Sequence, residues 1–324
     1  MKSAFILRRY LILAALPLVA VAHAQPAAYP TKPIRMVVAF PPGGLADVVA
    51  RIIFQPVTQQ LGHNIIIDNR PGANTIIGAQ VVAKAKPDGY TILLAIDGTL
   101  VMNPFLYSKL PYDPFKDFEP IAKVADIPSI FEANNNVPVK TVQDVISLAK
   151  AKPGELNMGV STPTSQVQAS LFNMMAGVNI VQVPYKGGTT QITGLMAGDI
   201  QLGMESANVS IPLWREGRIK IIGLTGAKRL TIAPEIPSIG ETLSGFDLDI
   251  WQSVVAPAGT PKEIIARLHA SLAKTMTNEE VRQKLLAVGI EPTISKSPDE
   301  FATFIKSQAD VREKVIKAVG MKLD

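Results

Sequence analysis

Short apolar runs rich in β-branched residues alternate with amphipathic helical segments along most of the chain. A strand that is apolar throughout is typical of one buried on both faces, and a helix between two such strands is the usual connection in a parallel sheet. The alternation therefore predicts an α/β protein with mainly parallel sheets. The runs expected to form strands are Ile34–Ala39, Ile65–Asp68, Thr91–Ala95, Leu156–Val160, Ile180–Val183, Ile200–Gly203 and Ile219–Leu224.

Capping residues locate several helix starts. Thr141 and Ser297 each stand three residues before a carboxylate, which is the spacing of a capping box. Thr260 has the same spacing, with proline at the first helical position. Pro56 lies inside the otherwise helical stretch 46–61, and because proline lacks an N–H we expect a kink or a break there.

The length of 324 residues, with 47% hydrophobic and 18% charged residues, is enough for two globular domains of ordinary size. Because the chain has no cysteine, disulfides, thiolate metal sites, a cysteine nucleophile and a lipoprotein anchor are excluded. No flexible linker or internal repeat marks a domain boundary. We expect chain crossings between domains near Asp126–Pro128 and Asp247–Trp251.

The N-terminal segment has the features of a secretory signal peptide. It opens with three basic residues, Lys2, Arg8 and Arg9. Leu11–Ala22 is apolar but too short to span a bilayer, and residues 22–24 form an A-x-A cleavage site. We therefore expect residues 1–24 to be removed, so that the mature protein begins at Gln25 in the periplasm. An uncleaved membrane anchor is the alternative.

The net charge of +5 is largely a property of that segment. Without its three basic residues, 29 basic residues stand against 27 acidic ones, a net charge of +2. The sequence contains no stripe of lysine and arginine with interleaved aromatic residues, so nucleic acid is not expected as a partner.

Polar, glycine-rich loops follow several of the expected strands. Phe40–Asp47 opens a helix, so its glycines allow a ligand to approach the backbone and the free helical N–H groups favour an anion. It has neither the Walker nor the dinucleotide glycine pattern, and an ordinary strand-to-helix turn is the alternative interpretation. Gly159–Gln166 repeats the arrangement with hydroxyl groups, for which a plain helix cap is the alternative.

Three further loops stand where strands are expected to end: Asp97–Thr99, Val183–Gly188 and Met204–Ser206. Lys186, in the second of them, is by itself more typical of a solvated charge than of a ligand contact. Ligands of open α/β sheets gather at the carboxyl ends of the strands. We therefore expect several of these loops to face one cleft.

These segments, in this order, resemble the tripartite tricarboxylate transporter solute receptors, also called Bug-type receptors. The resemblance runs from about Tyr29 to the C-terminus. Each motif is weak by itself, whereas the ordered set is specific. The motifs are Tyr29–Ile34, Phe40–Asp47, Asp68–Ala73, Lys86–Thr91, Leu110–Pro114, Val183–Gly188, Ala227–Arg229 and Ala256–Pro261.

The resemblance implies a two-domain, type II periplasmic binding protein-like fold with the ligand cleft between the domains. Residues 25–127 and 249–324 would form the first domain and residues 128–248 the second. A small organic carboxylate would bind between them and be delivered to integral membrane permease subunits. We expect a monomer without a cofactor or a metal. The candidate ligand-binding residues are Phe40, Gly43, Gly44, Asp47, Gly98, Thr99, Ser161, Thr164, Ser165, Lys186, Gly187 and Glu205.

Two departures from the family pattern bear on the identity of the ligand. The loop that starts at Ser161 is shorter, carries Pro163 and has Gln166 in place of a histidine. Glu205 stands where an aspartate is common. Aliphatic dicarboxylates, aromatic acids and nicotinate-like acids all stay open as ligands.

A periplasmic hydrolase is the rival class of protein. His63 and His269 have no nucleophile motif nearby, and the G-x-S-x-G pattern does not occur. The two S-x-x-K pairs lie inside expected helices without their companion motifs. We therefore expect no enzyme. A ligand-loaded partner of a membrane sensor kinase is compatible with a receptor and stays open.

Overall fold

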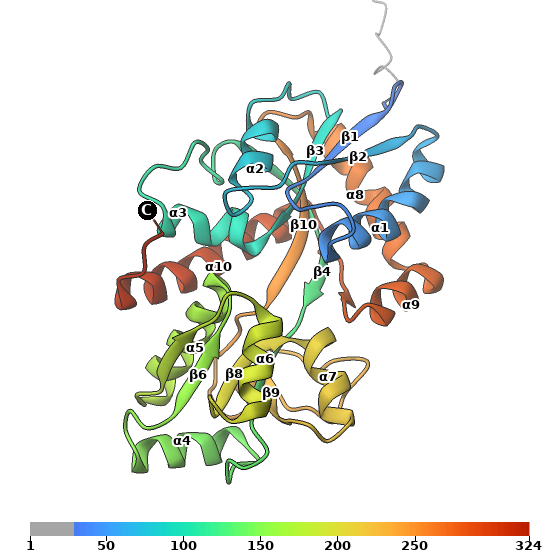
Figure 1. The fold of residues 1–324 in the computed structure, drawn as a ribbon. Coiled ribbons are helices and arrows are strands. Elements are labelled where there is room, and N and C mark those ends of the chain that lie inside the picture. Colours follow the sequence, from blue (N-terminus) through green and yellow to red (C-terminus); the bar gives the residue numbers. More distant parts are fainter. Residues whose placement is uncertain (1–28, 324) are drawn as a thin grey trace, which may run out of the picture.

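The computed structural model describes residues 29–323 and contains two sheets, one in each of two α/β domains (Figure 1). The first sheet has the strand order β11-β4-β10-β3-β1-β2, and the second has the order β7-β6-β8-β5-β9. The strands of the first sheet are β1 (Ile34–Val38), β2 (Ile65–Asn69), β3 (Thr91–Ile96), β4 (Phe118–Ile127), β10 (Ile250–Pro257) and β11 (Glu291–Pro292). Those of the second are β5 (Ser129–Ala133), β6 (Asn157–Val160), β7 (Val181–Pro184), β8 (Leu202–Ser206) and β9 (Lys220–Leu224).

Helices cover both sheets. The first domain contains α1 (Leu45–Leu61), α2 (Ile76–Ala83), α3 (Asn103–Leu106), α8 (Lys262–Met276), α9 (Glu279–Ala287) and α10 (Pro298–Val319), and a π-helical turn, Gly98–Met102, precedes α3. The second contains α4 (Val142–Ala151), α5 (Pro163–Ala176), α6 (Gly188–Ala197) and α7 (Ala207–Arg215). Apolar residues of α1 and α8 form one core on the first sheet, and those of α2 and α10 form another. No described helix is long and apolar enough to serve as a membrane span.

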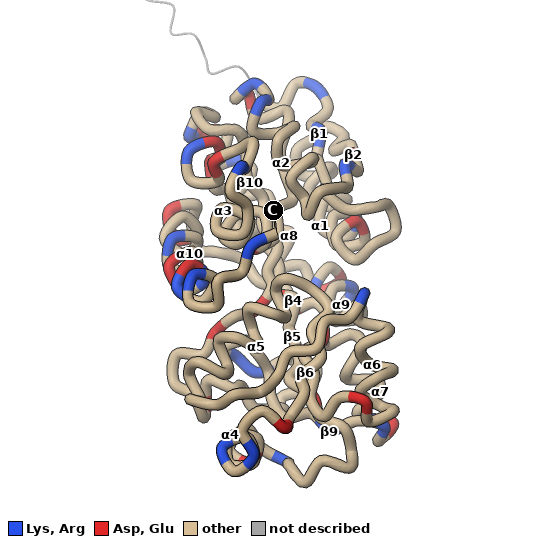
Figure 2. The backbone as a smooth tube through the Cα atoms, turned by 60° about the vertical axis from the view of Figure 1, so that its left-hand side comes forward, with Lys and Arg blue, Asp and Glu red and all other residues tan. Residues whose placement is uncertain are grey.

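The C-terminal helix α10 contacts both domains. Phe301 packs against Trp251 of β10 with its ring at 89° to the indole and a centroid distance of 5.8 Å. Farther along, Val315 and Ile316 belong to the core of the second domain, together with Phe172 of α5. Figures 1 and 2 show α10 alongside the junction of the two domains. This helix therefore fastens one side of the junction with apolar contacts.

The chain passes between the domains at two neighbouring places. β4 leads into β5 through Pro128, and the segment after β9 returns to β10 near Asp249. β4 and β10 are paired side by side, with Ile250 opposite Ile127 and Trp251 opposite Asp126. Crossing strands were expected at these residues, and the pairing brings them together as a double connection.

The prediction of mainly parallel sheets is wrong, because both sheets are mixed. β10 runs antiparallel to β3 and β4, and β5 runs antiparallel to β8 and β9. The sequence analysis did not predict β4, β5, β10 or β11 as strands, although it expected the chain crossings near β4 and β10. β4 leaves the first domain and β10 returns to it, so the two strands run in opposite directions where they pair, whereas parallel neighbours such as β1 and β3 need a crossover connection.

The helix starts agree in part with the capping prediction. Thr141 forms the expected capping box, and the Ser297 hydroxyl caps α10. The prediction for Thr260 is wrong, because its hydroxyl donates to the carbonyl of Pro257 at 2.7 Å and α8 starts without a side-chain cap. A kink or a break was expected at Pro56, and no break occurs, since α1 continues through that residue.

Candidate functional site

A cavity of about 350 Å³ lies between the two domains, where loops that follow strands of both sheets meet. We call it the interdomain cavity. The first domain contributes residues after β1 and β3, the end of β4 and the start of β10, and the second contributes the starts of β5 and α5 and the end of β8. The lining residues are Phe40, Leu45, Ala46, Asn74, Ile96, Gly98, Met102, Ile127, Ser129, Ser161, Thr162, Pro163, Thr164, Ser165, Gln168, Met204, Glu205, Ser206, Ile250 and Gln252.

This cavity brings together part of the candidate set from the sequence analysis. The candidates that line it are Phe40, Gly98, Ser161, Thr164, Ser165 and Glu205. The candidates that do not line it are Gly43, Gly44, Asp47, Thr99, Lys186 and Gly187. Ligand contact by any of these residues stays a prediction. The candidates outside the lining would act by shaping the wall of the cavity.

Asp47 holds the first loop in place. Its carboxylate accepts hydrogen bonds from the Gly43 N–H at 3.0 Å, from the Asn69 amide at 3.1 Å and from the Arg51 guanidinium at 2.9 and 3.0 Å. The hydrogen bonds from Arg51, with those from Gly43 and Asn69, lower the pKa of Asp47 to about 2 despite its burial. Gly43 has a φ of +77°, which a residue with a side chain would adopt only with strain. Asp47 thus holds the loop in place from outside the cavity lining. Phe40 and Leu45, on either side of the loop, line the cavity.

Buried polar contacts also position Gly98, which follows β3. The neighbouring Asp97 is fully buried and pairs with the equally buried Arg312 of α10 at 3.5 Å. Arg312 also donates to the carbonyl of Asp249 at 3.0 Å. The hydroxyl of Thr99 lies 2.8 Å from that of Thr75. These contacts join the cavity wall to α10 and to the return crossing.

The start of α5 uses most of its own hydrogen-bonding groups. The Ser165 hydroxyl accepts from the N–H groups of Ser161 and Thr162 at 3.0 Å, and the Thr162 hydroxyl accepts from the Ser165 N–H at 3.1 Å. The Thr164 hydroxyl donates to the Met102 sulfur across the domain boundary at 3.4 Å. This loop is therefore a helix cap that also lines the cavity, and its contact with a ligand stays a prediction.

Glu205 is the charged residue among those that line the cavity. Its Oε1 accepts from the N–H and the hydroxyl of Ser206 at 2.7 and 2.8 Å. Its Oε2 is buried and has no hydrogen-bond partner among residues 29–323. The carboxylate lies against Gly188, the first residue of α6, since a Cβ at Gly188 would collide with Oε2. Lys186, nearby in sequence, is exposed to solvent.

Gln168 and Gln252 are lining residues that the sequence analysis missed. Each is 1% exposed. The Gln168 amide donates to the carbonyl of Leu248 at 2.8 Å, whereas Oε1 of Gln252 is buried without a partner among the described residues. Gln168 could have been found from the sequence, because it is a polar residue on the same helix face as the apolar Leu171 and Phe172. Gln252 lies on a strand that was not predicted, so no comparable signal existed.

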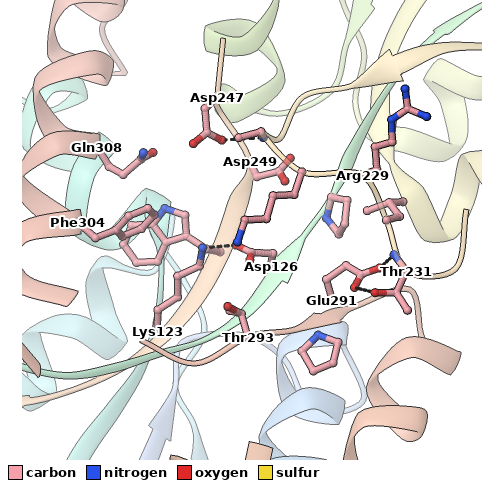
Figure 3. A pocket seen from close by; sticks show the side chains of 16 residues that line it. Lys123, Asp126, Arg229, Thr231, Asp247, Asp249, Glu291, Thr293, Phe304 and Gln308 are labelled. Carbon is pink, nitrogen blue, oxygen red and sulfur yellow. Dashed lines mark hydrogen bonds and ion pairs between the residues drawn. The ribbon is translucent and has the colours of Figure 1, made fainter. Parts of the chain in front are cut away.

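A second cavity, of about 390 Å³, lies at the double crossing, and we call it the hinge cavity (Figure 3). Several of its polar groups are engaged with one another: Lys123 pairs with Asp126 at 2.5 Å, and Thr231 donates to Glu291 through its N–H at 2.6 Å and its hydroxyl at 2.8 Å. Asp249 is half-buried there, and desolvation, followed by the charge of Asp126, raises its pKa to about 8. The residues that line it are Lys123, Asp126, Pro128, Ala227, Lys228, Arg229, Leu230, Thr231, Asp247, Asp249, Trp251, Glu291, Pro292, Thr293, Phe304 and Gln308.

The interdomain cavity has the chemistry of a small-molecule site. Apolar side chains such as Phe40, Met102 and Ile250 alternate around it with a few neutral hydroxyl and amide groups. Residues 29–323 contain no group of three or more His, Cys, Asp or Glu side chains placed to hold a metal. Two α/β domains joined by a double crossing, with such a cavity between their loops, define a bilobal solute-binding protein.

The chain belongs to the tripartite tricarboxylate transporter receptor family, because the family profile "Tripartite tricarboxylate transporter family receptor" matches residues 49–321. The resemblance inferred from the ordered motifs is thereby confirmed. Members of this family are receptors, which sets the hydrolase alternative aside.

Relatives of known sequence or structure agree with this assignment. A protein from Pseudomonas sp. strain P51, named for the tcbD–tcbE intergenic region, is 33% identical over 89% of this chain and 87% of its own length. The R. palustris protein Rpa4515, solved with adipate, is 34% identical with a TM-score of 0.74, covering 91% of this chain and 100% of that one. MatC from Rhodopseudomonas palustris, solved with bound malate, is 28% identical with a TM-score of 0.70, covering 89% and 100%. The two-domain binding-protein fold expected from the resemblance is confirmed.

Proposed function

We propose that this protein is an extracytoplasmic receptor that binds a small organic carboxylate in the interdomain cavity and delivers it to integral membrane permease subunits. The observation that carries the proposal is the cavity itself, which both domains line at their strand ends in a chain of the receptor family. Similar receptors solved with adipate and malate support a carboxylate as the ligand.

Within this proposal the candidate residues divide by position. Phe40, Gly98, Ser161 and Glu205 would face the ligand, together with Gln252. Asp47 and Thr99 would order the loops, and Gly43, Gly44, Lys186 and Gly187 would act from the rim or through the backbone. We further propose domain limits at residues 25–127 with 249–324, and at 128–248, so that both crossings lie at domain boundaries.

We propose that residues 1–24, which lie outside the described part of the chain, are a cleaved signal peptide and that the mature receptor is a periplasmic monomer. N-terminal sequencing of protein recovered from the periplasm should begin at Gln25. Recovery of chains starting at Met1 in the membrane fraction would contradict cleavage. If the receptor serves a sensor kinase instead of a permease, deletion of its gene should abolish induction and leave uptake intact.

The direct test is a thermal-shift screen of purified, ligand-stripped protein against aliphatic, aromatic and heteroaromatic acids. A ligand at about 100 times its Kd stabilises the folded state by about 2.7 kcal/mol, so we expect a clear rise in Tm with at least one acid. Ser161→Trp should remove that rise, because a large ring would fill the cavity. Ser147→Trp on the exposed face of α4 is the matched control and should keep it. A rise that survives in Ser161→Trp would place binding elsewhere.

A further inference from the structure

We propose that the ligand carries a carboxylate at one end only, and that its other end is a hydrogen-bond donor, a carboxamide or a protonated amine, that binds Glu205. This inference rests on the proposed function and specifies the class of ligand for the same cavity. Its basis is the charge of the lining, the free oxygen of Glu205 and the position of that carboxylate at the start of α6.

The charge of the lining disfavours a ligand with two carboxylates. Among the described residues that line the cavity there is no lysine, arginine or histidine, and Glu205 is the ionisable one. A single carboxylate can be held by neutral groups such as the hydroxyls of Ser129 and Ser161 and the amide of Gln252. A second carboxylate would have to enter the same cavity beside Glu205 without a compensating cation, and like charges in a desolvated site repel strongly.

Glu205 also occupies the place where a second carboxylate would be best stabilised. α6 begins at Gly188, and the unpaired N–H groups and dipole of a helix N-terminus favour an anion. The absence of a side chain at Gly188 lets the Glu205 carboxylate lie against that end of the helix. The protein thus supplies its own anion at this position, and the position is not available to an anionic group of the ligand.

Oε2 of Glu205 is a hydrogen-bond acceptor that has no donor among the described residues. Its Oε1 is saturated by Ser206, but Oε2 is buried and unpartnered within residues 29–323. A buried acceptor without a partner costs about 1–3 kcal/mol, which a ligand N–H would recover on binding. A carboxamide or an ammonium group supplies such a donor, whereas a carboxylate supplies only further acceptors.

The residues packed behind Glu205 also have buried oxygens without a hydrogen-bond partner among the described residues. Glu132 and Gln191 each have a buried oxygen, Oε1 in both, with no partner in the described part of the chain. Glu132 stands opposite Gly203 and Ile130 opposite Glu205 in the antiparallel β5–β8 pair, so the two glutamates share one face of the sheet. Burial, followed by the charge of Glu205, raises the pKa of Glu132 to about 8. Two further oxygens without a partner therefore lie behind Glu205, on residues that do not themselves line the cavity.

The test compares diacids with their isosteric monoamides by calorimetry at pH 7. Suitable pairs are adipate with adipamate, succinate with succinamate, and terephthalate with 4-carbamoylbenzoate, and 6-aminohexanoate adds a protonated amine of matched length. We expect the monoamide or amino acid of the best-fitting pair to bind at least tenfold more tightly than the diacid, which corresponds to about 1.4 kcal/mol. Glu205→Gln should weaken the donor-bearing ligand and strengthen the diacid, so that the ratio falls toward one.

Glu216→Gln, at the exposed end of α7, removes the same charge from the second domain outside the lining and should leave the ratio unchanged. A diacid that binds more tightly to the unmodified protein, or a ratio that Glu205→Gln leaves unaltered, would overturn the inference while leaving the proposed function in place. If none of these acids binds, the proposed function fails, and the inference fails with it.

Discussion

At the residue scale, the protein uses charged side chains mainly to fix loops around a nearly uncharged cavity. The Asp47 carboxylate accepts hydrogen bonds from Gly43, Asn69 and Arg51 but does not line the interdomain cavity. Arg312 and Asp97 do the same from the opposite side of the first sheet. Because these charges are paired within the protein and lie outside the lining, they leave the ligand to neutral donors and to Glu205.

Asp47→Ala should destabilise the protein and weaken ligand binding by loosening the first loop. We expect a loss of about 1–3 kcal/mol at pH 7, because several donors lose a shared acceptor. The pKa of Asp47 is lowered from 3.8 to about 2, so its stabilising contribution is present above pH 4 and is lost as the pH falls toward 2. Urea unfolding at a series of pH values measures this directly. The difference from the unmodified protein should shrink in acid, whereas Asp310→Ala, at an exposed residue of α10, should have little effect at any pH.

At the element scale, β4 and β10 form a partition between the two cavities. Ile127 lines the interdomain cavity while the preceding Asp126 lines the hinge cavity. Ile250 of β10 likewise faces the first cavity and Trp251 the second. Successive residues of a strand point to opposite faces, so two paired strands separate two sites of different chemistry. A rotation about the crossing that narrows one cavity must therefore widen the other.

Thr231→Val should raise ligand affinity about two- to fivefold, although Thr231 lies outside the interdomain cavity. Thr231 of the second domain and Glu291 of the first are joined across the hinge cavity by two hydrogen bonds (Figure 3). Closure on the ligand side separates these residues, so removing the hydroxyl makes closure less costly. The expected effect is small because the pair is exposed. Calorimetry measures the change, and Ser307→Val on the outside of α10 is the control. Weaker binding in Thr231→Val would mean that the contact belongs to the closed, ligand-bound arrangement.

At the scale of the whole molecule, the two domains touch on one side through α10 and are joined near the crossing, while the interdomain cavity lies between their loops. Val315 and Ile316 fasten α10 to the second domain by apolar contacts, and Met102 packs there as well. An arrangement with a double connection and a cavity between the lobes favours hinge closure around a ligand over a rearrangement within either lobe.

Saturating ligand should therefore make the protein more compact. Small-angle scattering should show a decrease in the radius of gyration with the acid that gives the largest thermal shift. Ser161→Trp, in which the cavity is filled, should show no ligand-dependent change. An unchanged radius in the unmodified protein, measured with the ligand demonstrably bound, would contradict hinged closure and favour a preformed, rigid site.

The sequence by itself determined the α/β class, the position of several helices and the family. These are local properties: β-branched runs such as Ile34–Val38, caps such as Thr141 and ordered loop motifs are each contained in a few consecutive residues. Phe40, Ser161 and Glu205 were found in the same way, as polar or glycine-rich loops after strands. The site residues are still a prediction, yet these three lie in one lining.

Only the tertiary structure decided which strands pair and which candidates share a cavity. The antiparallel placement of β10 depends on partners more than a hundred residues away in sequence, and Gln252 reaches the lining only because of that pairing. The free Oε2 of Glu205 likewise depends on the approach of Gly188 from another element. Whether a buried polar group has a hydrogen-bond partner, and which residues line a cavity, depends on residues that are distant in sequence. Neither property can therefore be determined before the chain is folded.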